Sequence, residues 1–170
     1  GVVITHGTDT LEETAYLLNL TIKSNKPIIV VGSMRPSTSI SADGPINLYN
    51  AIALAASKEA VGKGVLVVMN DEIFAARDVS KTNTTNANTF KADNSGAIGR
   101  IYYGKPQIYY NPTRAHTKNS EFDNVKRFSV LPKTEIIYMY AGQDASVIDK
   151  LVEDGTQAIV VAGVGDGNVY

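Results

Sequence analysis

The chain has 170 residues and a formal net charge of −1, from 16 Lys and Arg against 17 Asp and Glu. Its composition, 44% hydrophobic and 19% charged, is that of a globular protein with a buried core and argues against disorder. The balanced charge argues against nucleic-acid and anionic membrane partners, and the apolar runs are too short for a membrane helix. With no Cys and two His, the chain excludes thiol chemistry and disulfides, and it argues against a metal site. We expect a protein that acts on a small molecule, or a plain binding module.

Strand and helix patterns alternate over the first 70 residues. Apolar, β-branched runs at 2–5, 27–32 and 65–69 predict three strands. Apolar residues recur at helical spacing between them, at Leu11, Ala15, Leu18 and Ile22 and again at Leu48, Ile52, Ala55 and Ala56. A capping-box pattern places the start of the first helix at Asp9 or Thr10. This order is typical of a parallel sheet with right-handed crossovers.

The pattern is looser in the second half of the chain. Residues 70–94 are polar, residues 100–110 predict a hairpin at a sheet edge, and residues 111–133 are polar and lack periodicity. A strand at 135–140, a helix near 145–153 and a strand at 158–162 then restore the alternation. We therefore predict an α/β fold with a larger, parallel-sheet domain at 1–110, a polar linker at 111–133 and the start of a smaller α/β domain at 134–170.

The two ends of the sequence suggest a piece of a longer chain. The first residues already belong to an apolar run, and the last ones follow a Gly-rich turn at 163–168 without a helix after it. That turn also resembles a dinucleotide-binding turn, although its third Gly stands one position early.

Three polar loops follow the predicted strands, where open parallel sheets bind ligands. In the first, Thr8 and Asp9 lie beside free N–H groups of a helix N-terminus and could serve an anion or oxyanion, or Asp9 could simply cap the helix. His6 could orient Asp9, but it is interpreted as a structural, hydrogen-bonded residue, the commoner use of a lone histidine in a loop. In the second loop we expect Arg35 to pair with Asp43.

The third loop, over residues 70–85, contains a lysine among small hydroxyl residues. Lys81 could be drawn inward by these neighbours, while a solvated surface lysine is the commoner outcome. His116, in the predicted linker, is expected to be solvated.

Several segments resemble the bacterial-type asparaginase/glutaminase family in its order and spacing. ITHGTDTLEETAY at 4–16 is similar to the second signature of that family. VGSMRP at 31–36, SADGPINL at 41–48 and the residues from Met69 to Asn83 also match, as do His116-Thr117, Leu131-Pro132 and AGVG at 162–165. The resemblance covers nearly the whole chain and is densest over its first 85 residues.

The resemblance implies an amidohydrolase that converts L-asparagine to L-aspartate and ammonia by threonine-dependent acyl transfer, without cofactor or metal. Thr8, Asp9 and Lys81 would form a Thr-Lys-Asp arrangement, with Asp9 also holding the α-ammonium of a small amino-acid substrate. The carbonyl of Ser33 would contact the leaving amide nitrogen. Asn168 would reach in from a neighbouring subunit, because the family builds its sites between subunits of a homotetramer.

Two points stay open within this resemblance. Asn168 resembles the asparaginase type while Ser33 points weakly toward glutaminase activity, so the preference between asparagine and glutamine is not fixed. Lys81 could act as a base or as a fixed charge. The neighbourhood of Lys81 resembles the exported type of enzyme, which implies a periplasmic or secreted protein, with a cytoplasmic protein as the alternative.

One departure from the family is the primary nucleophile. The family carries it on a threonine in a Gly-Gly-Thr-Ile-like motif, which does not occur in this sequence. We therefore expect the 170 residues taken alone to be inactive. Two other hypotheses remain: a catalytically silent amino-acid-binding or assembly module on the same fold, and a nucleotide-binding α/β domain that uses the Gly-rich turn.

Overall fold

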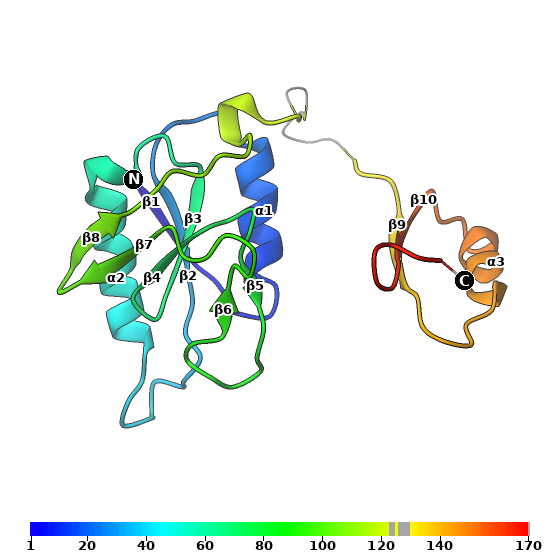
Figure 1. Cartoon of the computed structure of the whole chain (residues 1–170), viewed down its shortest axis with the longest axis horizontal. Coiled ribbons are helices and arrows are strands. Elements are labelled where there is room, and N and C mark those ends of the chain that lie inside the picture. The colour runs from blue at the N-terminus through cyan, green and yellow to red at the C-terminus, as the bar shows by residue number, and fades with distance from the viewer. Residues whose placement is uncertain (123–124, 126–129, 170) are drawn as a thin grey trace. The chain divides into compact units, whose positions relative to one another are not determined.

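A six-stranded sheet is the centre of the first of two units in this chain (Figure 1). The computed structural model describes residues 1–122, 125 and 130–169, and it divides into unit 1, Gly1–Val125, and unit 2, Lys126–Tyr170. The strands of unit 1 lie in the order β1 (Val2–Thr5), β2 (Ile28–Val31), β3 (Val65–Met69), β4 (Glu72–Ala75), β7 (Gly99–Tyr102) and β8 (Lys105–Ile108). The first three strands are parallel and the others antiparallel.

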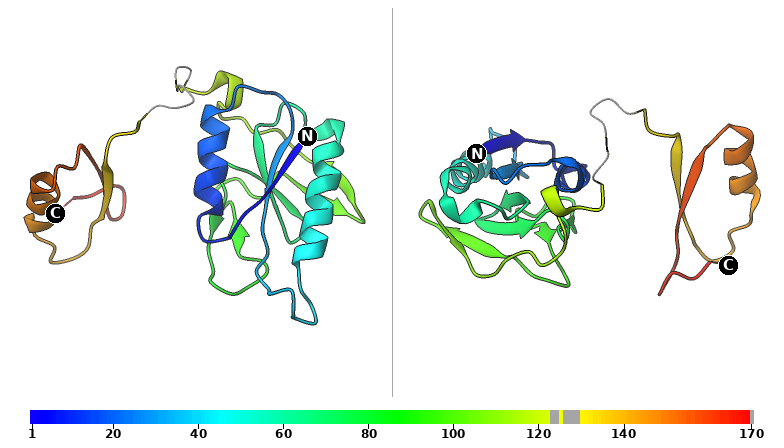
Figure 2. Two further views of the ribbon diagram at one scale, coloured as in Figure 1. Left: turned by 180° about the vertical axis from the view of Figure 1, so that it is seen from behind. Right: turned by 90° about the horizontal axis from the view of Figure 1, so that it is seen from above.

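Two helices cover this sheet, one on each face, as both Figure 1 and Figure 2 show. Side chains along β3 point alternately to each face, so that Val67 packs with Leu11 of α1 (Leu11–Thr21) while Leu66 packs with Leu54 of α2 (Gly44–Ala56). Short 3₁₀ helices lie at Lys58–Ala60 and Thr117–Asn119. The predicted α/β class is confirmed, with an antiparallel extension of the parallel strands.

The range 70–94, predicted as polar and irregular, contains three strands. Asn70 and Asp71 have φ angles of 52° and 62°, which form the tight turn from β3 into the buried strand β4. Further along, β5 (Ser80–Lys81) and β6 (Phe90–Lys91) form a small antiparallel hairpin. The hairpin predicted at 100–110 is confirmed as β7 and β8.

The helix-start prediction needs a correction. α1 begins at Leu11, and the side chain of Thr10 makes no capping hydrogen bond among the described residues. The backbone carbonyl of Thr10 instead accepts the first helical bond, from the N–H of Thr14 at 3.2 Å.

Part of the predicted linker is attached to unit 1. Lys23, two residues after the end of α1, donates to the carbonyl of Thr117 and to Ser120, each at 2.9 Å. Arg77 pairs with Glu121 at 2.6 Å and donates to the carbonyl of Ala115 at 2.8 Å. Residues 123–124 and 126–129 of the linker lie outside the described residues. The predicted boundaries at 110 and 133 stay predictions.

Unit 2 consists of one strand–helix–strand motif. Its elements are β9 (Thr134–Tyr138), α3 (Ser146–Glu153) and β10 (Ala158–Ala162), with the two strands parallel. In the Gly-rich turn that follows, Val164 and Asn168 form an antiparallel bridge. No described helix of the chain is both long and apolar enough to span a membrane.

Candidate active site

The loop between β1 and α1 rests directly on the end of β2. Gly32 makes this close approach possible, since a Cβ there would lie 2.8 Å from the carbonyl oxygen of His6 and 3.0 Å from Cγ2 of Thr8. His6 is fixed by Thr14, whose hydroxyl lies 2.9 Å from its Nε2. The predicted hydrogen bonding of His6 is confirmed, and the loop that carries Thr8 is held on both sides.

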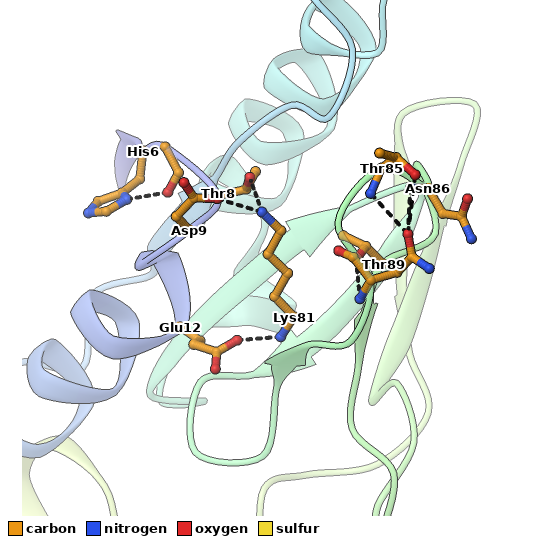
Figure 3. Close-up of polar contacts among 10 residues, drawn as sticks. His6, Thr8, Asp9, Glu12, Lys81, Thr85, Asn86 and Thr89 are labelled. Atoms are coloured by element: carbon orange, nitrogen blue, oxygen red, sulfur yellow. Dashed lines mark hydrogen bonds and ion pairs between the residues drawn. The ribbon is translucent and has the colours of Figure 1, made fainter. Parts of the chain in front are cut away.

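Lys81 brings its amine to this loop from the third predicted loop (Figure 3). Its Nζ lies 3.0 Å from Oγ1 of Thr8 and 2.7 Å from Oδ1 of Asp9. The Lys81 side chain is 16% exposed, whereas that of Asp9 is 93% exposed. Of the two outcomes considered for Lys81, the structure has the inward one.

The charge of Lys81 changes the acidity of its neighbour. Its hydrogen bond, together with its positive charge, lowers the pKa of the Asp9 carboxyl below the usual range. Asp9 is therefore ionised at neutral pH, and its exposed position leaves it accessible to a cationic ligand. The group as a whole joins a hydroxyl, an amine and a carboxylate.

The β5–β6 hairpin carries Lys81 and is attached to the hydrophobic core. Lys81 pairs with Phe90 across the hairpin, and the Phe90 side chain is buried in the core under α1. The buried hydroxyl of Thr89 accepts the N–H of Asn83 at 2.8 Å and donates to the carbonyl of the same residue. The side chain of Asn83 in turn accepts the N–H groups of Thr85 and Asn86.

The second predicted loop is fixed by buried polar side chains. Asp43 accepts the backbone N–H groups of Met34 and Arg35 at 2.9–3.1 Å, while Asn47 donates to the carbonyl of Gly32 at 3.1 Å. The predicted pairing of Arg35 with Asp43 is wrong at the level of side chains, because the guanidinium of Arg35 donates to the carbonyl of Ser41. Ser33 is thus held between two fixed neighbours.

A depression of about 450 Å³ lies where these two loops meet. Its wall consists of Thr5, His6, Gly7, Val31, Gly32, Ser33, Gly44 and Leu48. Thr8 follows Gly7 directly, so the depression begins beside the Thr8–Asp9–Lys81 group. Within the described residues, no three His, Cys, Asp or Glu side chains gather closely enough to hold a metal ion.

Residues 1–114 match the family described as "Asparaginase, N-terminal". The chain belongs to the asparaginase family. It is 54% identical to L-asparaginase 2 of Escherichia coli over 170 residues, which are all of this chain and 49% of that protein. It is 53% identical to the glutaminase-asparaginase of Pseudomonas fluorescens biotype A, covering 99% of this chain and 46% of that one.

Two further relatives differ in the compartment that their names state. One is the "Probable L-asparaginase periplasmic" of Haemophilus influenzae, 52% identical over 99% of this chain and 48% of the relative. The other is a crystal structure of a "Probable Cytoplasmic L-asparaginase" from Campylobacter jejuni, with a TM-score of 0.94 and 56% identity over 100% of this chain and 54% of that one. The chain spans about half the length of the curated relatives it matches.

Among the residues that the family resemblance singled out, the structure brings together Thr8, Asp9 and Lys81. Ser33 is exposed in the wall of the neighbouring depression. Asn168 is an exposed residue of the closing turn of unit 2, where its N–H donates to the carbonyl of Val164 at 2.8 Å. The structure describes each unit by itself, so the role of Asn168 stays a prediction.

The burial of two polar residues was missed by sequence reasoning. His116, predicted as solvated, is half-buried against Gly64, and this burial lowers the pKa of its imidazole. Asn47, fully buried, ties the end of β2 to the turn after β3 by accepting the N–H of Asn70 at 3.1 Å. The apolar face predicted for α2 is also wrong in part, because Leu48 and Ile52 are exposed, while Asn47, Ala51 and Leu54 are buried. Sequence spacing carries no signal for the burial of His116, which depends on residues far away in the chain.

Proposed function

We propose that the protein containing this chain hydrolyses the side-chain amide of L-asparagine to give L-aspartate and ammonia. The observation that carries the proposal is the contact of Lys81 Nζ with both Thr8 and Asp9, in a chain of the asparaginase family. The names of the relatives support the reaction and include glutaminase-asparaginases, so L-glutamine is the second amide to test.

The reaction is an acyl transfer to a threonine hydroxyl, which the family resemblance places in the Gly-Gly-Thr-Ile-like motif that does not occur in this sequence. The hydroxyl oxygen bonds to the amide carbon and loses its proton, the carbon–nitrogen bond breaks, and ammonia leaves with that proton. Water then hydrolyses the ester to release aspartate. In this scheme Thr8 and Lys81 assist proton transfer or stabilise the charge that develops. The carbonyl of Ser33 accepts an N–H of the leaving amide.

Asp9 has a second role in the proposal. Its carboxylate is ionised and 93% exposed, so one oxygen contacts Lys81 while the group stays open to solvent. An α-ammonium group is the cation of an amino-acid substrate that fits this position, and it would distinguish amino acids from simple amides. We propose that Asn168 of a neighbouring subunit completes the site in a homotetramer.

We further propose a periplasmic or secreted location. The relative from Haemophilus influenzae whose name states a periplasmic location supports it, while the solved relative is named as cytoplasmic. Cell fractionation with an antibody against the chain would decide between the two compartments.

The proposed reaction is tested by ammonia release from L-asparagine and L-glutamine, measured on the full-length protein that contains this sequence. We expect turnover of L-asparagine and a loss of about a thousand-fold in kcat in the Lys81→Met variant, because the variant removes the amine from the Thr8 hydroxyl. An undiminished rate would exclude Lys81 from both of its proposed roles. If the full-length protein binds L-aspartate in calorimetry and releases no ammonia from either amide, the proposal fails and the silent binding module is favoured.

A further inference from the structure

Glu12 holds the backbone of Lys81. Its carboxylate accepts the N–H of Lys81, and this hydrogen bond joins the first turn of α1 to strand β5 across 69 positions of the sequence (Figure 3). Glu12 is half-buried, whereas the next residue of the same turn, Glu13, is exposed. The two neighbouring carboxylates therefore have different surroundings.

This contact comes from the same short segment as the partners of the Lys81 amine. Thr8 and Asp9 hold Nζ, and Glu12, three residues after Asp9, holds the main chain of the same lysine. One short segment, residues 8–12, therefore holds both the main chain and the amine of Lys81. The two ends of this long and flexible residue are fixed against the same part of the molecule. Lys81 is extended between these two points in Figure 3.

An acidic residue in the first turn of a helix has a simpler explanation. Glu12 and Glu13 both lie where a negative charge interacts favourably with the helix dipole, and both are expected to stabilise α1 by this effect. That explanation applies equally to the two residues. It does not account for the bond to Lys81, which Glu12 makes.

We infer that Glu12 is a positioning residue that fixes strand β5 so that the amine of Lys81 meets Thr8 and Asp9. The inference rests on the proposed function, since the reaction gives the placement of Lys81 its importance. If this contact is lost, the main chain at Lys81 is held by the pairing of β5 with the two-residue strand β6. Small displacements of a reacting group are costly in rate, about 100-fold for about 1 Å.

The experiment compares Glu12→Ala with the matched control Glu13→Ala in the full-length protein. We expect Glu12→Ala to lower kcat for L-asparagine by about 10- to 100-fold with little change in KM, because Asp9 stays available to the substrate. Glu13→Ala loses a charge from the same turn and should keep kcat within about two-fold. Glu12→Gln retains an acceptor oxygen and should recover most of the lost activity.

Hydrogen exchange of the Lys81 amide supplies a readout that is independent of turnover. We expect faster exchange in Glu12→Ala and unchanged exchange in Glu13→Ala. Equal kcat values in the two alanine variants, or a change in KM alone, would overturn the positioning role. If the unmodified protein releases no ammonia while the Lys81 amide still depends on Glu12, it is the proposed function that fails and the contact that stands.

Discussion

The contact between Lys81 and Asp9 joins two very differently exposed groups. The side chain of Lys81 is 16% exposed and that of Asp9 is 93% exposed, although Nζ and Oδ1 lie 2.7 Å apart. The amine is therefore fixed by protein atoms, and the carboxylate is available for a ligand. This asymmetry is what a site needs when one member of an ion pair takes part in the chemistry and the other holds the substrate.

The pair makes a prediction about acidity at the residue scale. Lys81→Met removes the hydrogen bond and the charge that lower the pKa of Asp9, so this pKa should rise toward its ordinary value of 3.8. In the unmodified protein the pair stabilises the fold above the ordinary pKa, and the stabilisation is lost as the pH falls through the lowered value. The Lys81→Met variant should lack this pH-dependent contribution to the free energy of unfolding.

Titration of the Asp9 side-chain carbon by NMR measures the shift directly. The control is Lys91→Met, which removes a lysine from the partner strand of the same hairpin and should leave the titration of Asp9 unchanged. An identical pKa for Asp9 in Lys81→Met and in the unmodified protein would contradict the contact. Because Asp9 is exposed, its effect on the overall free energy of unfolding should be small.

The sequence carries part of this information. Hydroxyl and carboxylate side chains at a predicted strand–helix turn mark Thr8 and Asp9 as candidates without any structure. Local spacing cannot show that Lys81 turns inward, since its partners lie 73 and 72 positions away in the chain, and it was the family resemblance that grouped Lys81 with Thr8 and Asp9. A similar separation hides the contact of Glu12 with β5, because Glu12 and Lys81 lie 69 positions apart in the chain.

At the scale of elements, the β5–β6 hairpin is too short to be stable by itself. Each strand has two residues, and isolated hairpins are marginal in water even when longer. Its order comes from Phe90, which is buried in the core, and from Thr89, which is buried and bonded to Asn83. Core packing is in this way connected to the position of the Lys81 amine.

Thr89→Val tests that connection with nearly unchanged volume. The amide of Asn83 loses its acceptor, while the amide of Thr82 keeps the carbonyl of residue 89, 2.8 Å away. An unsatisfied group of this kind costs about 1 to 3 kcal/mol, so we expect exchange of the Asn83 amide to accelerate about ten-fold or more. Thr89→Ser retains the hydroxyl and is the matched control. Unchanged protection of Asn83 in Thr89→Val would show that the hydroxyl does not support the loop.

Elements differ in how well a sequence predicts them, for physical reasons. β3 is a continuous apolar run buried on both faces, and its bounds were predicted as observed. β4 is a short strand whose identity depends on the turn at Asn70 and Asp71, where both residues have positive φ. An Asn-Asp pair between apolar runs is a hairpin signal that would have found it. The two-residue strands β5 and β6 carry no periodicity that could be detected.

At the scale of the molecule, the two units have unequal cores. Unit 1 has a buried cluster on each face of its sheet. Within residues 130–169 the one buried apolar residue is Ile137, and Ile136 and Val160 are more than half exposed. The turn that carries Asn168 therefore depends on contacts beyond this motif for a fixed position. A role for Asn168 in catalysis thus needs contacts from outside residues 130–169, from other parts of the protein or from a second subunit.

Complementation between two inactive variants tests the proposed assembly. Asp9→Ala damages the site in unit 1 and Asn168→Ala damages it in unit 2, so each variant alone should have low activity. If each site combines unit 1 of one subunit with unit 2 of another, co-expression leaves about a quarter of the sites with both residues intact. The activity of the mixed full-length protein should then rise to about a quarter of that of the unmodified protein. A mixture no more active than the mean of its two components would show that Asn168 serves its own subunit, or none.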